Sequence, residues 1–129
     1  MSMARREFLV GVAGAAGLTV VAPTRFGEDG AEMYGLIGKM TAMAGRRDEL
    51  LAILTESVGE MPGCLSYIVA KDTIDSDAIW ITEAWDSKAS HDASLSLPQV
   101  RQSIARAKPL IAGFGNGVVT TPVGGHGLV

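Results

Sequence analysis

The segment Ala78–Trp85, with the sequence AIWITEAW, gives the strongest β-strand signal in the chain. It is rich in β-branched and aromatic residues, which fit a pleated surface, and its side chains alternate between two faces. One face carries Ile79, Ile81, Glu83 and Trp85. The other face carries Trp80, Thr82 and Ala84. Because both faces carry large apolar groups, a fold that covers only one of them leaves apolar surface in water.

The neighbouring segments predict how a sheet and its helices follow one another along the chain. The expected elements are a strand over Met33–Thr41, a helix over Ala44–Met61, strands over Cys64–Lys71 and Ala78–Trp85, helices over 87–95 and from Pro98 onward, and a last strand over Asn116–Pro122. The polar stretch Asp72–Asp77 suits a hairpin connection between two strands. This β-α-β-β-α-β order predicts a ferredoxin-like α+β fold.

A serine and two prolines set the expected helix ends in the second half of the chain. Ser87 suits an N-cap because its hydroxyl can accept a backbone N–H, and Pro98 suits a first helical turn. Pro109 is expected to interrupt the helix that begins at Pro98, because proline lacks a backbone N–H. The expected apolar stripe of that helix is Val100, Ile104, Ala107 and Ile111.

The two-faced strand also predicts the state of assembly. Helices can cover one face of a four-stranded sheet, and a second sheet can cover the other. We therefore expect a homodimer in which two sheets pack face to face, with each subunit's cavity between its own sheet and helices. The alternative is a monomer in which Trp80 or Trp85 is partly exposed.

The first 32 residues have the composition of an export leader followed by a linker. Ala4–Leu9 resembles the twin-arginine signal, with two arginines ahead of a Phe-Leu pair. The apolar run Val10–Ala22 is shorter than the roughly 20 residues that span a bilayer, so no stable membrane span is expected. We predict an exported, periplasmic or extracytoplasmic domain over residues 33–129. The alternative is a disordered apolar N-terminus with two chance arginines.

Charge and composition argue against several classes of protein. The net charge is −3, and no basic patch interleaved with aromatic residues suggests nucleic-acid binding. Cys64 is the only cysteine, so neither an intrachain disulfide nor a multi-cysteine metal site is expected. His91 and His126 are the only histidines, and without nearby cysteines they do not predict a metal site.

The segment Ile81–His91 is similar to the strand–turn–helix signature of the antibiotic biosynthesis monooxygenase (ABM) family. In that family a Glu and an aromatic residue end the third strand, and a His follows on the helix. Met61–Cys64 and Pro109–Ile111 also fit the family, and the resemblance covers Met33–Thr121. It implies a ferredoxin-like domain that forms a dimeric α+β barrel. The most similar group is the quinol monooxygenases, cofactor-free enzymes that oxidise phenol or quinol rings with O₂.

Two departures from the family pattern limit what the resemblance implies. Many members place the helix His nine residues after the aromatic residue, where this chain has Ser94. Its own His91 lies three residues earlier, on the same helix face. The haem-degrading branch uses an Asn on the first strand, whereas the only Asn here is Asn116. Haem degradation is therefore disfavoured.

Five residues are the candidates for cofactor-free oxygen chemistry. Such an enzyme must deprotonate its substrate in a dry pocket and stabilise the resulting anion. We predict His91 and Glu83 as catalytic residues, because imidazole titrates near neutral pH and a buried Glu has a raised pKa or an ion-pair partner. Trp85 could stack on a planar ring, and Tyr67 or Ser94 could hydrogen-bond a substrate oxygen.

Four of these five candidates also have a purely structural interpretation. In that interpretation Trp85 and Tyr67 serve only in packing, Glu83 pairs with an arginine across a dimer interface, and His91 is solvated. The predicted function is a monooxygenase acting on a small quinol-like or aromatic substrate with O₂ and no cofactor. The alternatives are a non-catalytic dimer that binds a small aromatic ligand or acts in a stress response, and an isomerase on the same scaffold.

Overall fold

A computed structural model describes residues 32–56 and 61–128 of the 129-residue chain. The predicted export signal therefore lies outside the described residues, as do residues 57–60 at the end of the first predicted helix. None of the helices in the described part of the chain is long and apolar enough to cross a membrane.

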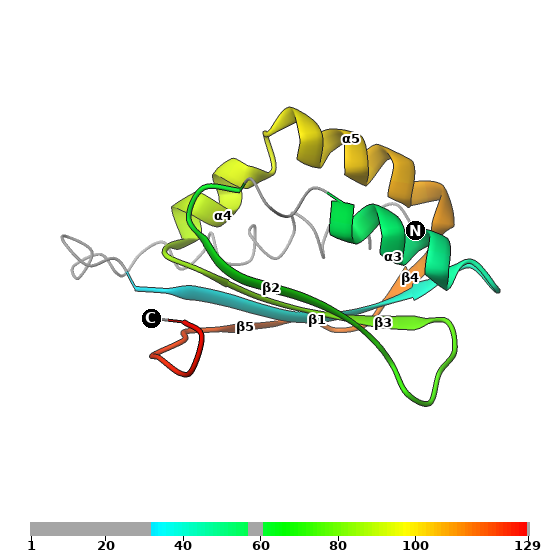
Figure 1. Cartoon of the computed structure of the whole chain (residues 1–129), viewed down its shortest axis with the longest axis horizontal. Helices are drawn as coiled ribbons and strands as arrows, with labels where there is room; N and C mark the ends of the chain where they lie inside the picture. Colours follow the sequence, from blue (N-terminus) through cyan, green and yellow to red (C-terminus); the bar gives the residue numbers. More distant parts are fainter. Residues whose placement is uncertain (1–31, 57–60, 129) are drawn as a thin grey trace.

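The described chain forms two layers, an antiparallel sheet and a set of helices on one of its faces (Figure 1). In chain order the elements are β1 (Tyr34–Ala42), α3 (Arg47–Glu56), β2 (Cys64–Lys71), β3 (Ala78–Trp85), α4 (Lys88–Ser94), α5 (Pro98–Ala107), the short 3₁₀ helix η3 (Lys108–Leu110), β4 (Ile111–Phe114) and β5 (Val118–Thr120). The ferredoxin-like α+β fold predicted from the sequence is confirmed.

The sheet has the order β2-β3-β1-β4, with β5 also pairing with β1. Strands β1 and β3 lie at its centre and run antiparallel, with Tyr34 opposite Trp85 and Met40 opposite Ile79. On the other side of β3, Tyr67 of β2 lies opposite Glu83. Since directly opposed residues point to the same face, this register brings Tyr67, Glu83 and Trp85 onto the face that the helices cover.

Strands β2 and β3 match the expectation to the residue, and the last predicted strand, Asn116–Pro122, is present as the shorter β5, Val118–Thr120. The strand β4 ahead of it was not predicted. The C-terminal segment contributes two short strands, β4 and β5, which pair with opposite ends of β1. Ile111 was expected in the helix stripe but begins β4, because the α-helix ends at Ala107, ahead of Pro109. The first helix also begins later than predicted, at Arg47. Ser87 accepts the backbone N–H of Ser90 as the expected N-cap.

The core between sheet and helices is divided into two clusters. The larger comprises Met40, Ala42, Leu50, Ile53, Ile79, Ile81, Ala107, Leu110 and Ile111. The smaller comprises Tyr34, Leu36 and Trp85, with Met61 and Cys64 packed against it. Along β3 the inward face thus changes from isoleucine in the larger cluster to Glu83 and Trp85 at the other end.

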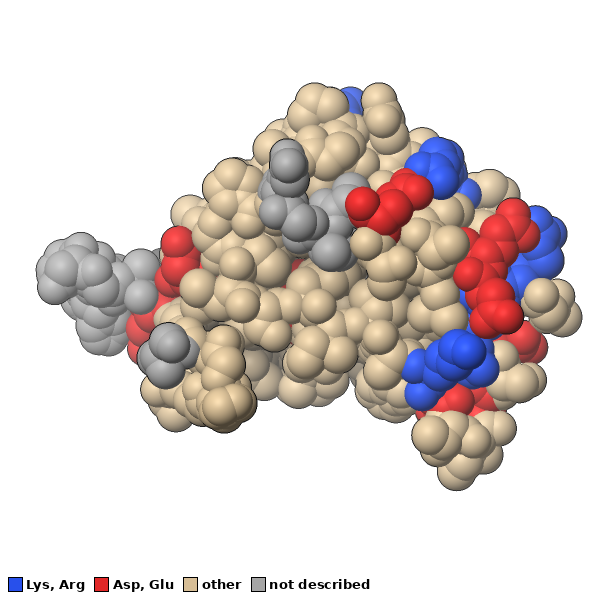
Figure 2. Space-filling view, in the orientation of Figure 1, with Lys and Arg blue, Asp and Glu red and all other residues tan. Residues whose placement is uncertain are grey.

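The opposite face of the sheet is not covered by helices (Figure 1). Trp80 is 38% exposed there, whereas Trp85 on the helix side is buried. Figure 2 shows that most of the charged side chains on the viewed side gather toward one end of the molecule, while a smaller acidic group lies at the opposite end. Near the first of these ends Arg47 donates hydrogen bonds to the carbonyls of Asp72, Asp75 and Ala78. Arg47 therefore ties the start of α3 to the β2–β3 hairpin.

A polar-ended cavity between sheet and helices

A cavity of about 90 Å³ lies between the sheet and the helices. Most of its wall is apolar and comes from both core clusters, with Met40 and Ile53 from the larger one and Trp85 and Met61 from the smaller. Its polar groups come from β2, β3, α4 and α5, and they are Tyr67, Glu83, Trp85, His91, Ser94 and Ser103. No lysine or arginine occurs among the described residues that line it.

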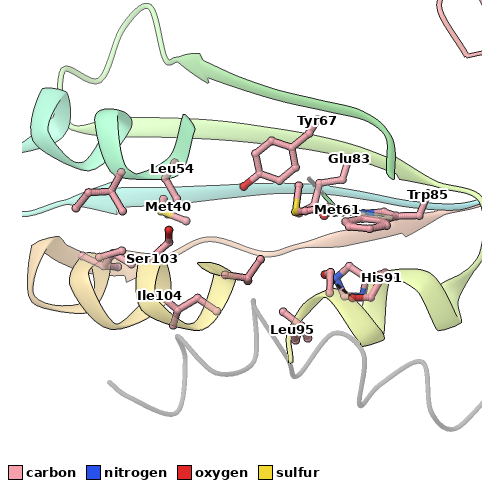
Figure 3. A pocket seen from close by; sticks show the side chains of 15 residues that line it. Met40, Leu54, Met61, Tyr67, Glu83, Trp85, His91, Leu95, Ser103 and Ile104 are labelled. Atoms are coloured by element: carbon pink, nitrogen blue, oxygen red, sulfur yellow. Dashed lines mark hydrogen bonds between the residues drawn. The ribbon is translucent and has the colours of Figure 1, made fainter. Parts of the chain in front are cut away.

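All five residues predicted from the sequence line this one cavity (Figure 3). Tyr67, Glu83 and Trp85 project from the sheet, and His91 lies opposite them on α4. Ser94 follows His91 one turn later on the same helix. Their catalytic and substrate-binding roles remain predictions.

Glu83 is the acidic group at the polar end. Burial raises the pKa of its carboxyl group, while the hydrogen bond from Trp85 and the nearby His91 act in the opposite direction. Trp85 Nε1 donates that bond to Glu83 Oε1 at 2.9 Å. Burial, with smaller contributions from Glu83 and Cys64, likewise raises the pKa of the Tyr67 hydroxyl. Both groups thus hold their protons more tightly than they do in water.

His91 is 3% exposed, so the solvated interpretation of this residue is wrong. Its ring meets Trp85 edge to face, with centroids 5.5 Å apart, and is tilted against Tyr34 at 5.1 Å. The Nδ1 atom lies 3.0 Å from Oδ1 of Asp92. Contacts on several sides therefore fix the orientation of the imidazole.

Ser94 occupies the position where many family members carry histidine. Its side chain is buried, and its hydroxyl donates a 2.6 Å hydrogen bond to the carbonyl oxygen of His91. Serine commonly forms such a bond to its own helix when it is buried in one. The hydroxyl proton of Ser94 is therefore engaged by the backbone, which leaves its oxygen as an acceptor at the cavity wall.

The turn Met61–Gly63 places one wall of the cavity against α4. Gly63 has a φ of 87°, a conformation that favours glycine. A Cβ at this position would also collide with the side chain of Ser90. The amide of Asp86 donates to the Gly63 carbonyl at 2.8 Å. Close approach at Gly63 thus fixes the turn that carries Met61 into the cavity.

Three polar residues near the site were not singled out from the sequence. Asp92 contacts His91, and its position directly after that histidine was an available signal. The hydroxyl of Tyr34 is buried without a hydrogen-bond partner among the described residues, and burial, with Asp92 and Glu83, raises its pKa to about 12. Ser103 lines the cavity from α5. Neither Tyr34 nor Ser103 stands out in a strand or helix pattern.

The described residues contain no group of three or more His, Cys, Asp or Glu side chains that could hold a metal ion. Cys64 is a free thiol whose pKa is raised by burial and by Glu83. His126 lies beyond β5 in the C-terminal tail and does not line the cavity. The polar groups that the described residues present to the cavity are a carboxyl group, an imidazole, an indole N–H and hydroxyl groups.

Fold and cavity together define a ferredoxin-like protein with a largely apolar, polar-ended pocket. The model of the antibiotic biosynthesis monooxygenase family matches residues 33–106. This chain belongs to the antibiotic biosynthesis monooxygenase family. A search of functionally curated proteins gives no match.

Solved structures support the same assignment. A provisionally assigned antibiotic biosynthesis monooxygenase from Chloroflexus aurantiacus J-10-fl is 62% identical, with a TM-score of 0.73, over 75% of this chain and 99% of that one. A second such protein, from Caulobacter crescentus CB15, is 17% identical, with a TM-score of 0.58, over 70% of this chain and 88% of that one. The latter shares the fold alone.

Proposed function

We propose that this protein is a cofactor-independent monooxygenase that oxidises quinol-like or phenolic rings with O₂. The observation that carries the proposal is the gathering of Glu83, Trp85 and His91 at one end of a single, largely apolar cavity. An apolar enclosure holds a ring and excludes water, and a few placed polar groups orient it. The absence of lysine and arginine from the described lining favours a neutral substrate over a carboxylate or phosphate.

In the proposed reaction, His91 accepts a proton from a ring hydroxyl. The resulting electron-rich anion supplies the electrons that reduce O₂. One oxygen atom enters the ring and the other leaves as water, so a naphthoquinol and O₂ give a hydroxynaphthoquinone and H₂O. Trp85 stacks on or flanks the ring, and Tyr67 donates a hydrogen bond to one of its oxygens. Glu83, whose pKa is raised by burial, lines the same end of the cavity.

Oxygen uptake with reduced menadione tests this proposal. We expect uptake above the rate of spontaneous oxidation with the unaltered protein, and His91→Gln should lower the catalysed rate by about 100-fold or more, the usual contribution of a general base. His126→Gln is the matched control, because His126 lies outside the cavity, and it should retain full activity. Saturable binding of menadione without catalysed uptake from any of several quinols would favour the ligand-binding alternative.

We propose, further, that a second copy of the chain covers the open face of the sheet, as in a dimeric α+β barrel. Ile37 of β1 lies opposite Thr82 and Val118, and Ile68 lies opposite Thr82 from the other side, so these residues form a row across that face. Ile68 is 54% exposed in the single chain, and contiguous apolar surface of this kind marks an interface. The family is typically dimeric.

Sedimentation of the full chain tests this assembly. We expect a dimer, and Ile37→Glu should shift the mass to that of a monomer because it would bury a charge between the sheets. Ile74→Glu is the matched control, since Ile74 lies exposed in the β2–β3 hairpin and should leave the dimer intact. A monomeric unaltered chain would contradict the proposal.

Export by a twin-arginine route is a separate proposal. The support is the Arg5-Arg6 pair before Phe8-Leu9, followed by the apolar run of residues 10–22. Replacing both arginines with lysine removes the arginine pair but keeps the charge of the leader. We expect this pair of substitutions to move the protein from the exported to the cytoplasmic fraction of cells, and an unchanged distribution would contradict the proposal.

A further inference from the structure

We propose that Asp92 is a positioning residue that, held by Lys88, fixes His91 in the tautomer with its proton on Nδ1 and thereby presents Nε2 as the base. The role of His91 as a base rests on the proposed function. The tautomer and the arrangement that sets it do not depend on that function. No prediction from the sequence assigned a role to Asp92 or Lys88.

The first step of the argument is the contact between neighbouring residues of α4. Oδ1 of Asp92 lies 3.0 Å from Nδ1 of His91. A carboxylate can only accept a hydrogen bond, so the proton must be on Nδ1 when the imidazole is neutral. The other ring nitrogen then carries a lone pair, because a neutral imidazole has one donor and one acceptor nitrogen.

The second step is the anchoring of the carboxylate. Lys88 Nζ lies 2.6 Å from the other oxygen, Oδ2, of Asp92, one helical turn earlier. Each oxygen of Asp92 therefore has its own partner, and Lys88 disfavours rotation of the carboxylate away from His91. Lys88 and Asp92 are partly exposed while His91 is buried, so the row of contacts runs from the surface of α4 to the cavity wall.

The third step is the environment of the ring itself. Tyr34 from β1 and Trp85 from β3 pack against the imidazole, which limits rotation about its side-chain bonds. Glu83 from β3 is the further titratable group that interacts with His91. With the ring clamped and Nδ1 held by Asp92, His91 can act on a ligand in the cavity only through Nε2. This is the base–carboxylate arrangement that hydrolases use to orient a histidine.

Nitrogen NMR of the full-length protein measures the tautomer directly and needs no substrate. The chain has two histidines, so His126→Gln assigns the remaining imidazole signals to His91. In the neutral form of the imidazole, we expect a proton on Nδ1 and none on Nε2. Asp92→Asn should increase the population with the proton on Nε2, because the carboxamide can donate to Nδ1. Asp86→Asn, an exposed acidic residue just before α4, is the matched control and should change nothing.

Kinetics with reduced menadione give the second measurement. We expect Asp92→Asn to lower kcat by at least about tenfold, part of what a general base contributes, with KM changed by less than about twofold, because Asp92 does not line the cavity. Lys88→Met should lower kcat less than Asp92→Asn does. A proton on Nε2 in the unaltered protein, or an unchanged tautomer in Asp92→Asn, would overturn the proposal. If the tautomer is as expected but the protein consumes no O₂, the positioning role stands and the proposed function fails.

Discussion

The two ends of the layer between sheet and helices differ in how they are filled. At one end Ile79 and Ile81 of β3 pack against Leu50 of α3 in a continuous apolar cluster. At the other end the same face of β3 carries Glu83 and Trp85, which line the cavity together with His91. A single strand thus supplies a close-packed half and a hollow, polar half. Burying an acid at the second end costs stability, and favourable interactions elsewhere in the fold offset such costs at functional sites.

The largest effect on stability is expected at the packed end. Leu50 is fully buried, and Leu50→Ala should lower the free energy of unfolding by about 2–5 kcal/mol, from lost burial and the new cavity. Urea unfolding at one fixed protein concentration measures the change. Leu54→Ala, at the partly buried edge of the same helix, should cost less. Equal losses would mean that the two positions are packed alike.

Trp85 lies at the hollow end, and its replacement should have an intermediate effect on stability. Trp85→Phe removes the indole N–H that donates to Glu83, which leaves a buried acid without this partner and should cost about 1–3 kcal/mol. Trp80→Phe is the comparison on the open face, where the lost bond to Asp72 is exposed. It should cost under about 1 kcal/mol. Urea unfolding measures both changes. If Trp80→Phe lowers the free energy of unfolding more than Trp85→Phe does, the expected difference between the open face and the hollow end is contradicted.

Glu83→Gln should show that burying the Glu83 carboxyl group lowers the stability of the folded protein in a pH-dependent way. Burial raises the folded-state pKa above the ordinary Glu value of 4.5, so the unfolded chain releases this proton first as pH rises. The unaltered protein therefore loses stability from about that pH up to the folded-state pKa, and Gln, which does not titrate, avoids this loss. The stability of Glu83→Gln relative to the unaltered protein should be greater at about pH 8 than at about pH 4. A pH-independent difference would contradict a pKa of Glu83 that burial raises in the folded state.

The smallest effect is expected for Tyr34→Phe. The Tyr34 hydroxyl is buried without a hydrogen-bond partner in the described chain, so its removal eliminates a desolvated polar atom and keeps the ring against His91. The thermal midpoint should stay the same or rise slightly. A clear fall would show that the hydroxyl makes a bond, for example to a bound water.

Strand alternation and turn chemistry were sufficient to predict most of the fold. Strands β2 and β3 follow from runs such as AIWITEAW between turns, and Ser87 and Pro98 set helix starts because their local chemistry is strong. The region after Pro109 was harder, because Ile111 continues the apolar spacing of α5 although the helix has already ended. Short strands that pair with the two ends of β1 leave little periodicity to detect.

The site was predicted in part because its residues fall on one strand and the helix that follows. Strand alternation placed Glu83 and Trp85 on one face, whereas His91 was singled out through the family resemblance, and the structure shows that all three line one cavity. Whether His91 was solvated depended on packing by Tyr34, which is distant in sequence. The role of Asp92 required the position of its carboxylate relative to Nδ1, which sequence does not contain.

Isotope labelling of the product tests most directly whether the hollow end is an oxygenation site. Reduced menadione would be incubated with the protein under ¹⁸O₂ and the product analysed by mass spectrometry. The account predicts a hydroxylated quinone that carries one ¹⁸O atom, formed by the unaltered protein and His126→Gln but not by His91→Gln. Menadione alone, with hydrogen peroxide as the reduced product or at the rate seen without protein, would contradict it.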